Sequence, residues 1–132
     1  MMGLLLNRGK LLADREKLGR WGEKRCEGFL KKKGFKELAR NFSCRSGEID
    51  LIMADAEGAV VFVEVKTRTD ETFAPAEAVI TPDKKDKLYR AARYFLTIHN
   101  IENRPYRFDV VTIVLSRTGG KQIKHYKNAF VR

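Results

Sequence analysis

The chain carries two short runs that decide its fold, Gly47-Glu48-Ile49-Asp50-Leu51-Ile52 and, further on, Val60-Val61-Phe62-Val63-Glu64-Val65-Lys66. Both are typical of β-strands, because they are rich in β-branched and apolar residues and are bounded by turn residues. Yet Asp50, Glu64 and Lys66 stand where core residues are expected. Isolated charges are rarely buried unless they are paired or bind a metal. These three residues therefore indicate a functional site.

Length and composition predict one folded, soluble domain, since the chain has 132 residues of which 43% are hydrophobic and 33% are charged. The formal net charge is +10, from 27 Lys and Arg against 17 Asp and Glu. Such an excess favours an anionic partner, which can be nucleic acid, an acidic protein or a membrane surface. Nucleic acid is the favoured partner, because small basic domains bind it through counterion release. The alternative is a basic surface without a specific partner.

The two cysteines, Cys26 and Cys44, lack the spacing of a zinc site. A disulfide stays open, although reduced thiols in a cytoplasmic protein are favoured. No apolar run approaches the ~20 residues of a membrane span, and no signal peptide is recognisable, so no membrane partner is expected. We expect residues 1–13 to form an N-terminal extension and residues 14–132 to form a single domain.

Periodicity predicts the order helix, three strands, helix, strand. Gly34 is expected to cap the first helix, while Thr81 and Pro82 are typical of the start of the second. No strand is predicted in the basic tail after residue 120. This order predicts an α/β fold with a central mixed sheet flanked by helices, with elements at residues 14–33, 35–44, 48–54, 59–68, 81–99 and 106–115.

The chemistry depends on how the second and third strands pair. Residues i and i+2 of a strand face the same way, so Glu48 lies with Asp50 and Glu64 lies with Lys66. If Asp50 lies opposite Glu64, then Glu48 lies opposite Lys66 and all four groups converge. A slip of one residue separates the two pairs. We expect the convergent arrangement, because four separately buried charges would be costly.

Neighbouring carboxylates suit a hard divalent cation such as Mg²⁺ or Mn²⁺, which prefers oxygen ligands. The backbone carbonyl of Val65 can add a ligand. A bound metal polarises a phosphoryl oxygen and activates water, and Lys66 can orient that water or hold a phosphate oxygen. These parts suit phosphodiester hydrolysis. The competing interpretation is that the acids and the lysine form edge ion pairs on a solvated face.

Gly47-Glu48-Ile49-Asp50-Leu51-Ile52 and Phe62-Val63-Glu64-Val65-Lys66-Thr67-Arg68 resemble the core of the YraN-like bacterial proteins. That family is similar in turn to the PD-(D/E)xK nuclease superfamily, nearest to archaeal-type Holliday junction resolvases. The resemblance covers about residues 14 to 115 and implies a restriction-endonuclease-like αβββαβ core. It also implies a nuclease site, without specifying a substrate.

Gly22-Glu23 in the first predicted helix matches the Gly-Glu common at that place in the family. The resemblance therefore implies that Glu23, with Asp50 and Glu64, binds Mg²⁺ or Mn²⁺ beside Lys66. The chain departs from the family in the loop Thr72–Pro75, where Ala74 replaces a frequent glycine.

Several other residues have two alternative roles each, one functional and one structural. Glu48, Arg68 and Lys84 are accessory candidates, Glu48 as a supporting acid and the two cations as phosphate ligands or as solvated surface residues. Asp109 either supports the site or pairs with a nearby arginine, the favoured role. Among the aromatic residues, Trp21 and Tyr89 can stack on bases, although packing is favoured. Neither His99 nor His125 has visible catalytic partners.

The sequence thus predicts a Mg²⁺-dependent endonuclease acting on structured or branched DNA. The alternative is a catalytically silent module on a nuclease fold that binds nucleic acid or another protein. A homodimer would suit two-fold junction substrates by analogy.

Overall fold

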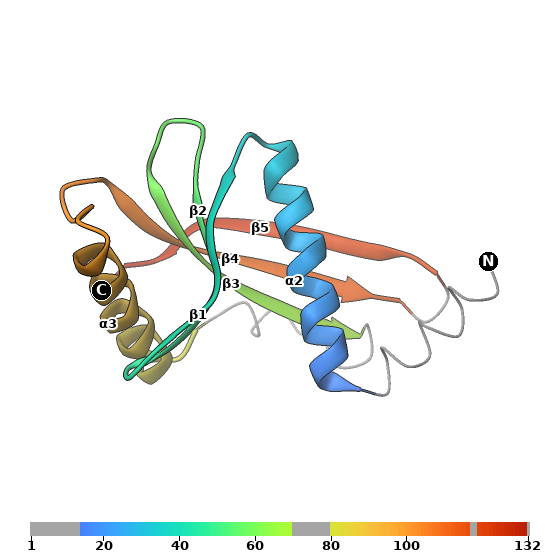
Figure 1. Cartoon of the computed structure of the whole chain (residues 1–132). Helices are drawn as coiled ribbons and strands as arrows, with labels where there is room; N and C mark the ends of the chain where they lie inside the picture. The colour runs from blue at the N-terminus through green and yellow to red at the C-terminus, as the bar shows by residue number, and fades with distance from the viewer. Residues whose placement is uncertain (1–13, 70–79, 117–118, 132) are drawn as a thin grey trace.

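The computed structural model describes residues 14–69, 80–116 and 119–131, so the proposed N-terminal extension and the loop Thr72–Pro75 lie outside the described residues. It contains a five-stranded mixed sheet and two helices, with the strands in the order β1-β2-β3-β4-β5 (Figure 1). The predicted α/β fold is confirmed. The elements are α2 (Arg15–Lys32), β1 (Lys36–Cys44), β2 (Gly47–Ala54), β3 (Val60–Thr69), α3 (Pro82–Ile98), β4 (Tyr106–Leu115) and β5 (Lys121–Phe130).

Only the pair β3 and β4 is parallel, and the helix α3 makes the crossover between them. The other neighbouring strands are antiparallel. The strand β5 was not predicted, because most of its side chains are exposed and many are charged. It is an edge strand that pairs with β4. Because few of its side chains are buried, the alternation of apolar and polar residues in its sequence is weak.

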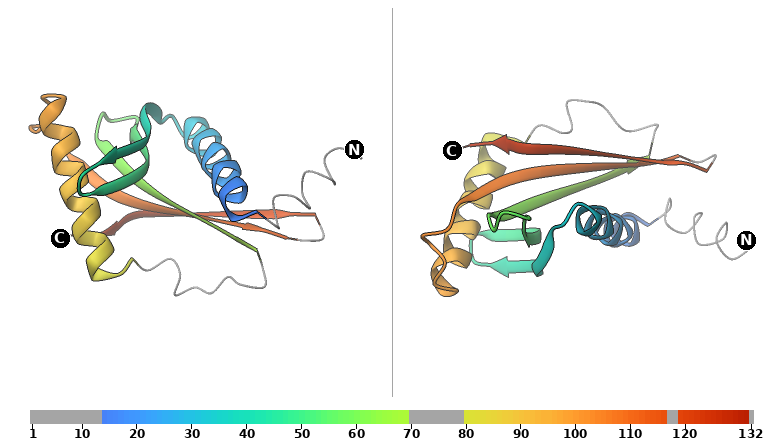
Figure 2. Two further views of the ribbon diagram at one scale, coloured as in Figure 1. Left: turned by 60° about the horizontal axis from the view of Figure 1, so that its bottom comes forward. Right: turned by 90° about the horizontal axis from the view of Figure 1, so that it is seen from above.

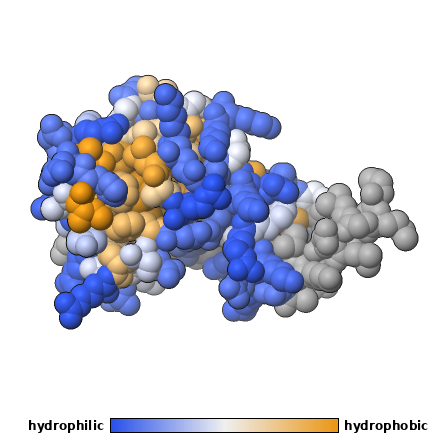
Figure 3. All heavy atoms as spheres, in the orientation of Figure 1, coloured by the Kyte–Doolittle hydropathy of each residue, from blue (hydrophilic) through white to orange (hydrophobic). Residues whose placement is uncertain are grey.

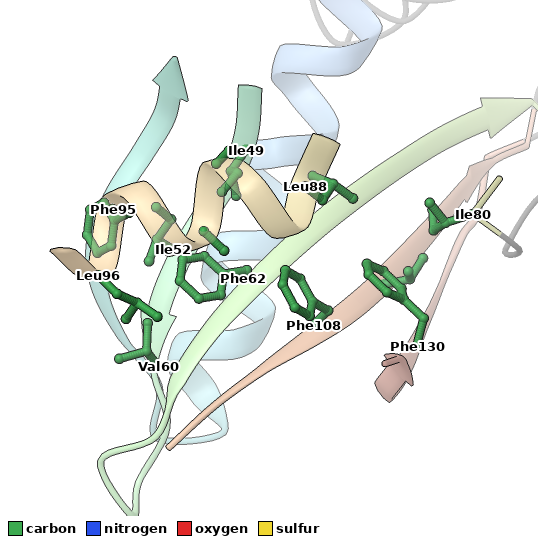
Figure 4. Close-up of a cluster of buried hydrophobic side chains, with 13 residues drawn as sticks. Ile49, Ile52, Val60, Phe62, Ile80, Leu88, Phe95, Leu96, Phe108 and Phe130 are labelled. Carbon is green, nitrogen blue, oxygen red and sulfur yellow. The ribbon is translucent and has the colours of Figure 1, made fainter. Parts of the chain in front are cut away.

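The two faces of the sheet carry separate cores. Phe62 and Phe108 pack under α3, whereas Val61 and Val63 pack under α2. Figure 4 shows the first of these cores, with Phe62 and Phe108 beneath α3 and Phe130 farther along, toward Ile80. Figure 2 shows α2 crossing the sheet and α3 lying beside one end of it. The strand β3 is therefore covered on both faces, as its continuous apolar pattern predicted.

Local signals set the ends of both helices. Gly34 has φ of 92°, and the amides of Gly34 and Phe35 donate to the carbonyls of Lys31 and Leu30, which is a Schellman motif. The Thr81 hydroxyl accepts a hydrogen bond from the Lys84 amide at 3.2 Å, and Pro82 follows it in the first turn. These caps confirm the predicted ends.

Apolar side chains also reach the surface. In Figure 3 they gather on one side of the view, over α3 and β1. These two elements carry Leu38, Tyr94 and Ile98, whose exposed fractions are 41%, 51% and 46%. Among the described residues, no helix is long and apolar enough to cross a membrane.

Gly22 sets the distance between α2 and β3. A Cβ atom built on Gly22 would lie 1.9 Å from the Thr67 hydroxyl oxygen, which is closer than any real contact. We expect Gly22→Ala to destabilise the protein by about 1 to 3 kcal/mol, because the helix must shift away from the strand. The measurement is the free energy of unfolding in urea.

Gly28 provides the matched control for Gly22. It lies on the same helix, and a Cβ atom there would meet nothing within 4 Å. Gly28→Ala should stabilise by up to about 1 kcal/mol through helix propensity. If both variants were stabilised alike, the close approach at Gly22 would be refuted.

Candidate functional site

The site forms where β2 and β3 separate. Their ladder runs from Ala54–Val60 to Leu51–Val63 and ends there. The next residues in the same register are Asp50 and Glu64, so their side chains come together at the point where this ladder ends. The Val65 amide donates to Asp50 Oδ2 at 2.8 Å. This hydrogen bond occupies the place of the next strand pair and holds the carboxyl group in the gap.

Asp50 and Glu64 are in direct contact, because their carboxyl groups share a hydrogen bond. Burial raises the pKa of Glu64 to about 7, and the neighbouring Asp50 charge adds to this effect. Burial also raises the pKa of Asp50, against the opposing hydrogen bonds from the Val65 amide and from Glu64. A proton between the two carboxyl groups therefore relieves their repulsion, as in other close carboxylate pairs.

One oxygen of Glu64 is left without a hydrogen bond. Glu64 Oε2 is buried and has no hydrogen-bond partner among the described residues. The Lys84 ammonium lies 3.6 Å away, as an ion pair beyond hydrogen-bond distance. An orphaned buried carboxylate oxygen fits a cation ligand.

The predicted cationic residues surround this carboxylate. A hollow of about 390 Å³, here called the site hollow, opens beside Glu64. Lys66 is on the same face as Glu64, two residues along β3, and its charge opposes the rise in the pKa of Glu64. Arg68 donates to the Thr67 carbonyl at 2.9 Å. The lining comprises Glu64, Val65, Lys66, Arg68, Ile80, Thr81 and Lys84.

Val65 and Glu48 occupy different places relative to the gap. In a β-strand the amide and the carbonyl of one residue point to the same side, so the Val65 carbonyl faces the gap with its amide. Glu48 pairs with Ser43 of β1 and is exposed. Because the β2–β3 ladder ends at Leu51, Glu48 does not pair with Lys66 in the way the predicted register required. The Glu48 charge nevertheless raises the pKa of Asp50.

Glu23 approaches from the helix α2, which covers the opposite face of the sheet. It hydrogen-bonds Asn41 of β1, and burial together with the Asp50 charge raises the pKa of Glu23. Asn41 adopts φ of 48°, an uncommon value that presents its side chain to the helix. Within residues 14–69, 80–116 and 119–131, no three His, Cys, Asp or Glu side chains form a group ready to hold a metal. A metal-binding role for Glu23 stays a prediction.

A second charged cluster lies on the α2 face. Asp109 is fully buried and accepts hydrogen bonds from His125 Nε2 at 2.7 Å, the Asn128 amide at 2.9 Å and Arg107 Nε at 3.0 Å. Arg107 also donates to Asp55 Oδ2 at 2.6 Å. Burial alone would raise the pKa of Asp109, but these hydrogen bonds hold it below its ordinary value. The favoured prediction, that Asp109 pairs with an arginine, agrees with this geometry.

His125 corrects the expectation that neither histidine has partners. Its side chain is 4% exposed, and Lys33 Nζ lies 3.2 Å from Nδ1. An ammonium only donates, so Nδ1 accepts and Nε2 carries the proton given to Asp109. This contact was not predictable without β5, the strand that carries His125. The alternation of Ile123 and His125 was the one signal of an inward face.

The raised pKa of Glu64 predicts a pH-dependent stability. The unfolded carboxyl group titrates near 4.5 and the folded one near 7, so the folded state holds an extra proton between these values. The stabilisation is complete below the unfolded pKa and is lost as pH rises through the folded pKa. In EDTA, the free energy of unfolding of wild type minus that of Glu64→Gln should therefore fall across this window. Urea titrations at several pH values check this, and a constant difference would contradict it.

The fold and the site define an α/β domain with a carboxylate pair and a lysine where two strands diverge. The model of the uncharacterised protein family UPF0102 matches residues 22–113, and the chain belongs to this family, which is the YraN family. A UPF0102 protein of Pelotomaculum thermopropionicum is 40% identical over 121 residues, covering 90% of this chain and 100% of its own. One from Pelobacter propionicus is 38% identical over 118 residues, covering 89% and 84%. One from Syntrophomonas wolfei is 42% identical over 113 residues, covering 86% and 96%.

Proposed function

We propose that this protein is a metal-dependent endonuclease that hydrolyses phosphodiester bonds in structured or branched DNA. The observation that carries the proposal is the contact between the Asp50 and Glu64 carboxyl groups, with Glu64 Oε2 buried and lacking a hydrogen bond. Two carboxylates sharing one proton are suited to exchange that proton for a divalent cation.

Asp50, Glu64 and the Val65 carbonyl would hold Mg²⁺ or Mn²⁺, with Glu23 as a further proposed ligand. When bound, the metal polarises a phosphoryl oxygen and lowers the pKa of its water. Lys66, in the same hollow, holds a phosphate oxygen or orients the attacking water. Arg68 and Lys84 line that hollow and offset the charge of the phosphodiester.

Calorimetric titration with Mn²⁺ tests the metal site directly. Wild type should bind Mn²⁺, and Asp50→Ala should abolish this binding because it removes one of the two paired carboxylates. Glu57→Gln is the control, since Glu57 is exposed in the turn between β2 and β3 and should bind like wild type. Absence of Mn²⁺ binding in wild type, or unchanged binding in Asp50→Ala, would overturn the proposed metal site.

A second candidate is a nucleic-acid-binding module that does not cleave. It is favoured by the ion pair between Lys84 and Glu64, in which an ammonium stands where a metal would be expected. On the nuclease proposal, Lys84→Ala should tighten Mn²⁺ binding several-fold because it removes a repelling charge. On the module proposal, Mn²⁺ binds neither form, and DNA affinity falls steeply with salt.

A further inference from the structure

A second hollow lies on the other side of α3 from the site. Its volume is about 380 Å³, and it lies between α3, the start of β4 and the end of β5. We call it the aromatic hollow. Its lining comprises Tyr89, Tyr106, Arg107, Phe108, Asn128, Phe130 and Val131. It shares no lining residue with the site hollow.

Stacked rings form the base of the aromatic hollow. Phe108 and Phe130 are nearly parallel, at 20°, with centroids 4.8 Å apart, and Figure 4 shows them side by side. The ring centroids of Tyr89 and Tyr106 lie 6.5 and 6.0 Å from that of Phe108. Both tyrosines are half-buried, and both line the hollow. The packing of Phe108 and Phe130 holds these tyrosine rings in place.

Cations stand over the same rings. Lys85 Nζ lies 5.7 Å from the centroid of Phe130, and the Arg93 guanidinium lies 5.9 Å from that of Tyr89. Arg93 also donates to the Tyr89 hydroxyl at 3.3 Å. No Asp or Glu occurs among the described residues that line the hollow. Aromatic rings with cations beside them match the chemistry of a nucleotide, which combines a flat base with a phosphate.

The first turn of α3 joins the two hollows. Lys84 contacts Glu64 in the site, and Lys85, the next residue, contacts Phe130 at the aromatic hollow. Successive residues of a helix point about 100° apart, so these two lysines project from different sides of α3. A strand bound at the site can therefore pass this turn and reach the tyrosines.

We propose that the aromatic hollow binds an unpaired base of the nucleic-acid strand held at the site. The base stacks on Tyr89 and Tyr106, while Lys85 and Arg93 contact the flanking phosphates. The position of the nucleic-acid strand at the Asp50–Glu64 site rests on the proposed function. A base inside a duplex is already stacked on its neighbours, so the substrate class becomes DNA with a single-stranded segment next to the cleaved bond.

Fluorescence anisotropy in EDTA tests this site without any cutting. The probes are a labelled single-stranded 12-mer, its duplex and a set of single strands carrying one abasic position each. Tyr89→Ala should weaken single-strand binding about 5- to 150-fold, the usual range for one stacked base, and should change duplex binding by less than about two-fold. Tyr89→Leu keeps an apolar side chain on Phe108 and should show a similar loss if Tyr89→Ala does not fold.

Tyr94→Ala is the matched control, because Tyr94 is an exposed tyrosine of α3 that packs on Phe42 away from the hollow. It should bind every probe like wild type. One abasic position should weaken wild type as strongly as Tyr89→Ala does, and should not weaken Tyr89→Ala further. Equal losses on single strand and duplex, no effect of any abasic position, or equal losses in Tyr94→Ala would each overturn the proposal.

The two proposals fail separately. Single-strand binding that depends on Tyr89, in a protein that cuts no DNA with Mg²⁺ or Mn²⁺, would overturn the nuclease proposal and keep the aromatic hollow. Metal-dependent cutting that is indifferent to Tyr89 and to abasic positions would overturn the aromatic hollow alone.

Discussion

Asp50→Asn is expected to reduce Mg²⁺- or Mn²⁺-dependent cutting of branched DNA to background, a loss of at least about 1,000-fold. The side chain keeps its shape and can still accept the hydrogen bond that the Val65 amide donates at 2.8 Å. It loses the negative charge that balances a divalent cation. Cutting is measured on four-way junctions, flapped duplexes and single strands, with urea unfolding as the check on the fold.

Two further variants distinguish the effect of a change in the site from the effect of a change elsewhere in the protein. Lys66→Ala should also abolish cutting but should leave Mn²⁺ binding in place, because Lys66 is assigned to phosphate or water. Glu57→Gln should cut like wild type. Equal cutting by wild type, Asp50→Asn and Lys66→Ala would identify a contaminating nuclease and refute the assignment.

Asp109→Asn is expected to cost about 3 to 5 kcal/mol of the free energy of unfolding at neutral pH. It removes the buried negative charge that accepts hydrogen bonds from His125, the Asn128 amide and Arg107, and it leaves Arg107 with Asp55 as its remaining carboxylate partner. Asp109 is 0% exposed and joins β4 to β5 through His125 and the Asn128 amide. A loss of this size is a large part of the stability of a small domain. Urea or thermal unfolding measures it.

The lowered pKa of Asp109 also gives the pH dependence a sign. The stabilisation is present above the unfolded pKa and is lost as pH falls through the lower folded pKa, so the difference between wild type and Asp109→Asn should shrink in acid. Glu16→Gln is the control, since its pair with Arg20 is exposed and should be worth less than about 0.5 kcal/mol. A cost for Asp109→Asn as small as the control's would show that the cluster is not structural.

The helices and the central strands were predictable because their signals are local. Thr81 and Pro82 start α3, and Gly34 ends α2, through contacts within a few residues. The continuous apolar run of β3 predicts a strand that is covered on both faces. By contrast, β5 is defined by pairing with β4, and its exposed charged residues hide that role.

The candidate site was predictable in composition and only partly in geometry. The spacing of Asp50, Glu64 and Lys66 predicted that they meet where β2 and β3 pair, and Asp50 and Glu64 do meet at the end of that ladder. Beyond the end of the β2–β3 ladder at Leu51, Glu48 of β2 is paired with Ser43 of β1, and Glu23 of α2 is hydrogen-bonded to Asn41. Each of these depends on strands and helices distant in sequence.

By itself, the sequence determined three properties of this protein. Charged residues interrupt two apolar strands, capping residues set the ends of both helices, and the net charge is +10. Those properties follow from residue types and short spacings. Only the tertiary structure decided that Asp50 meets Glu64, that Asp109 meets His125 and that Tyr89 and Tyr106 share one hollow. Register and packing join residues far apart in the chain, and a shift of one residue between two strands would turn their side chains to opposite faces of the sheet.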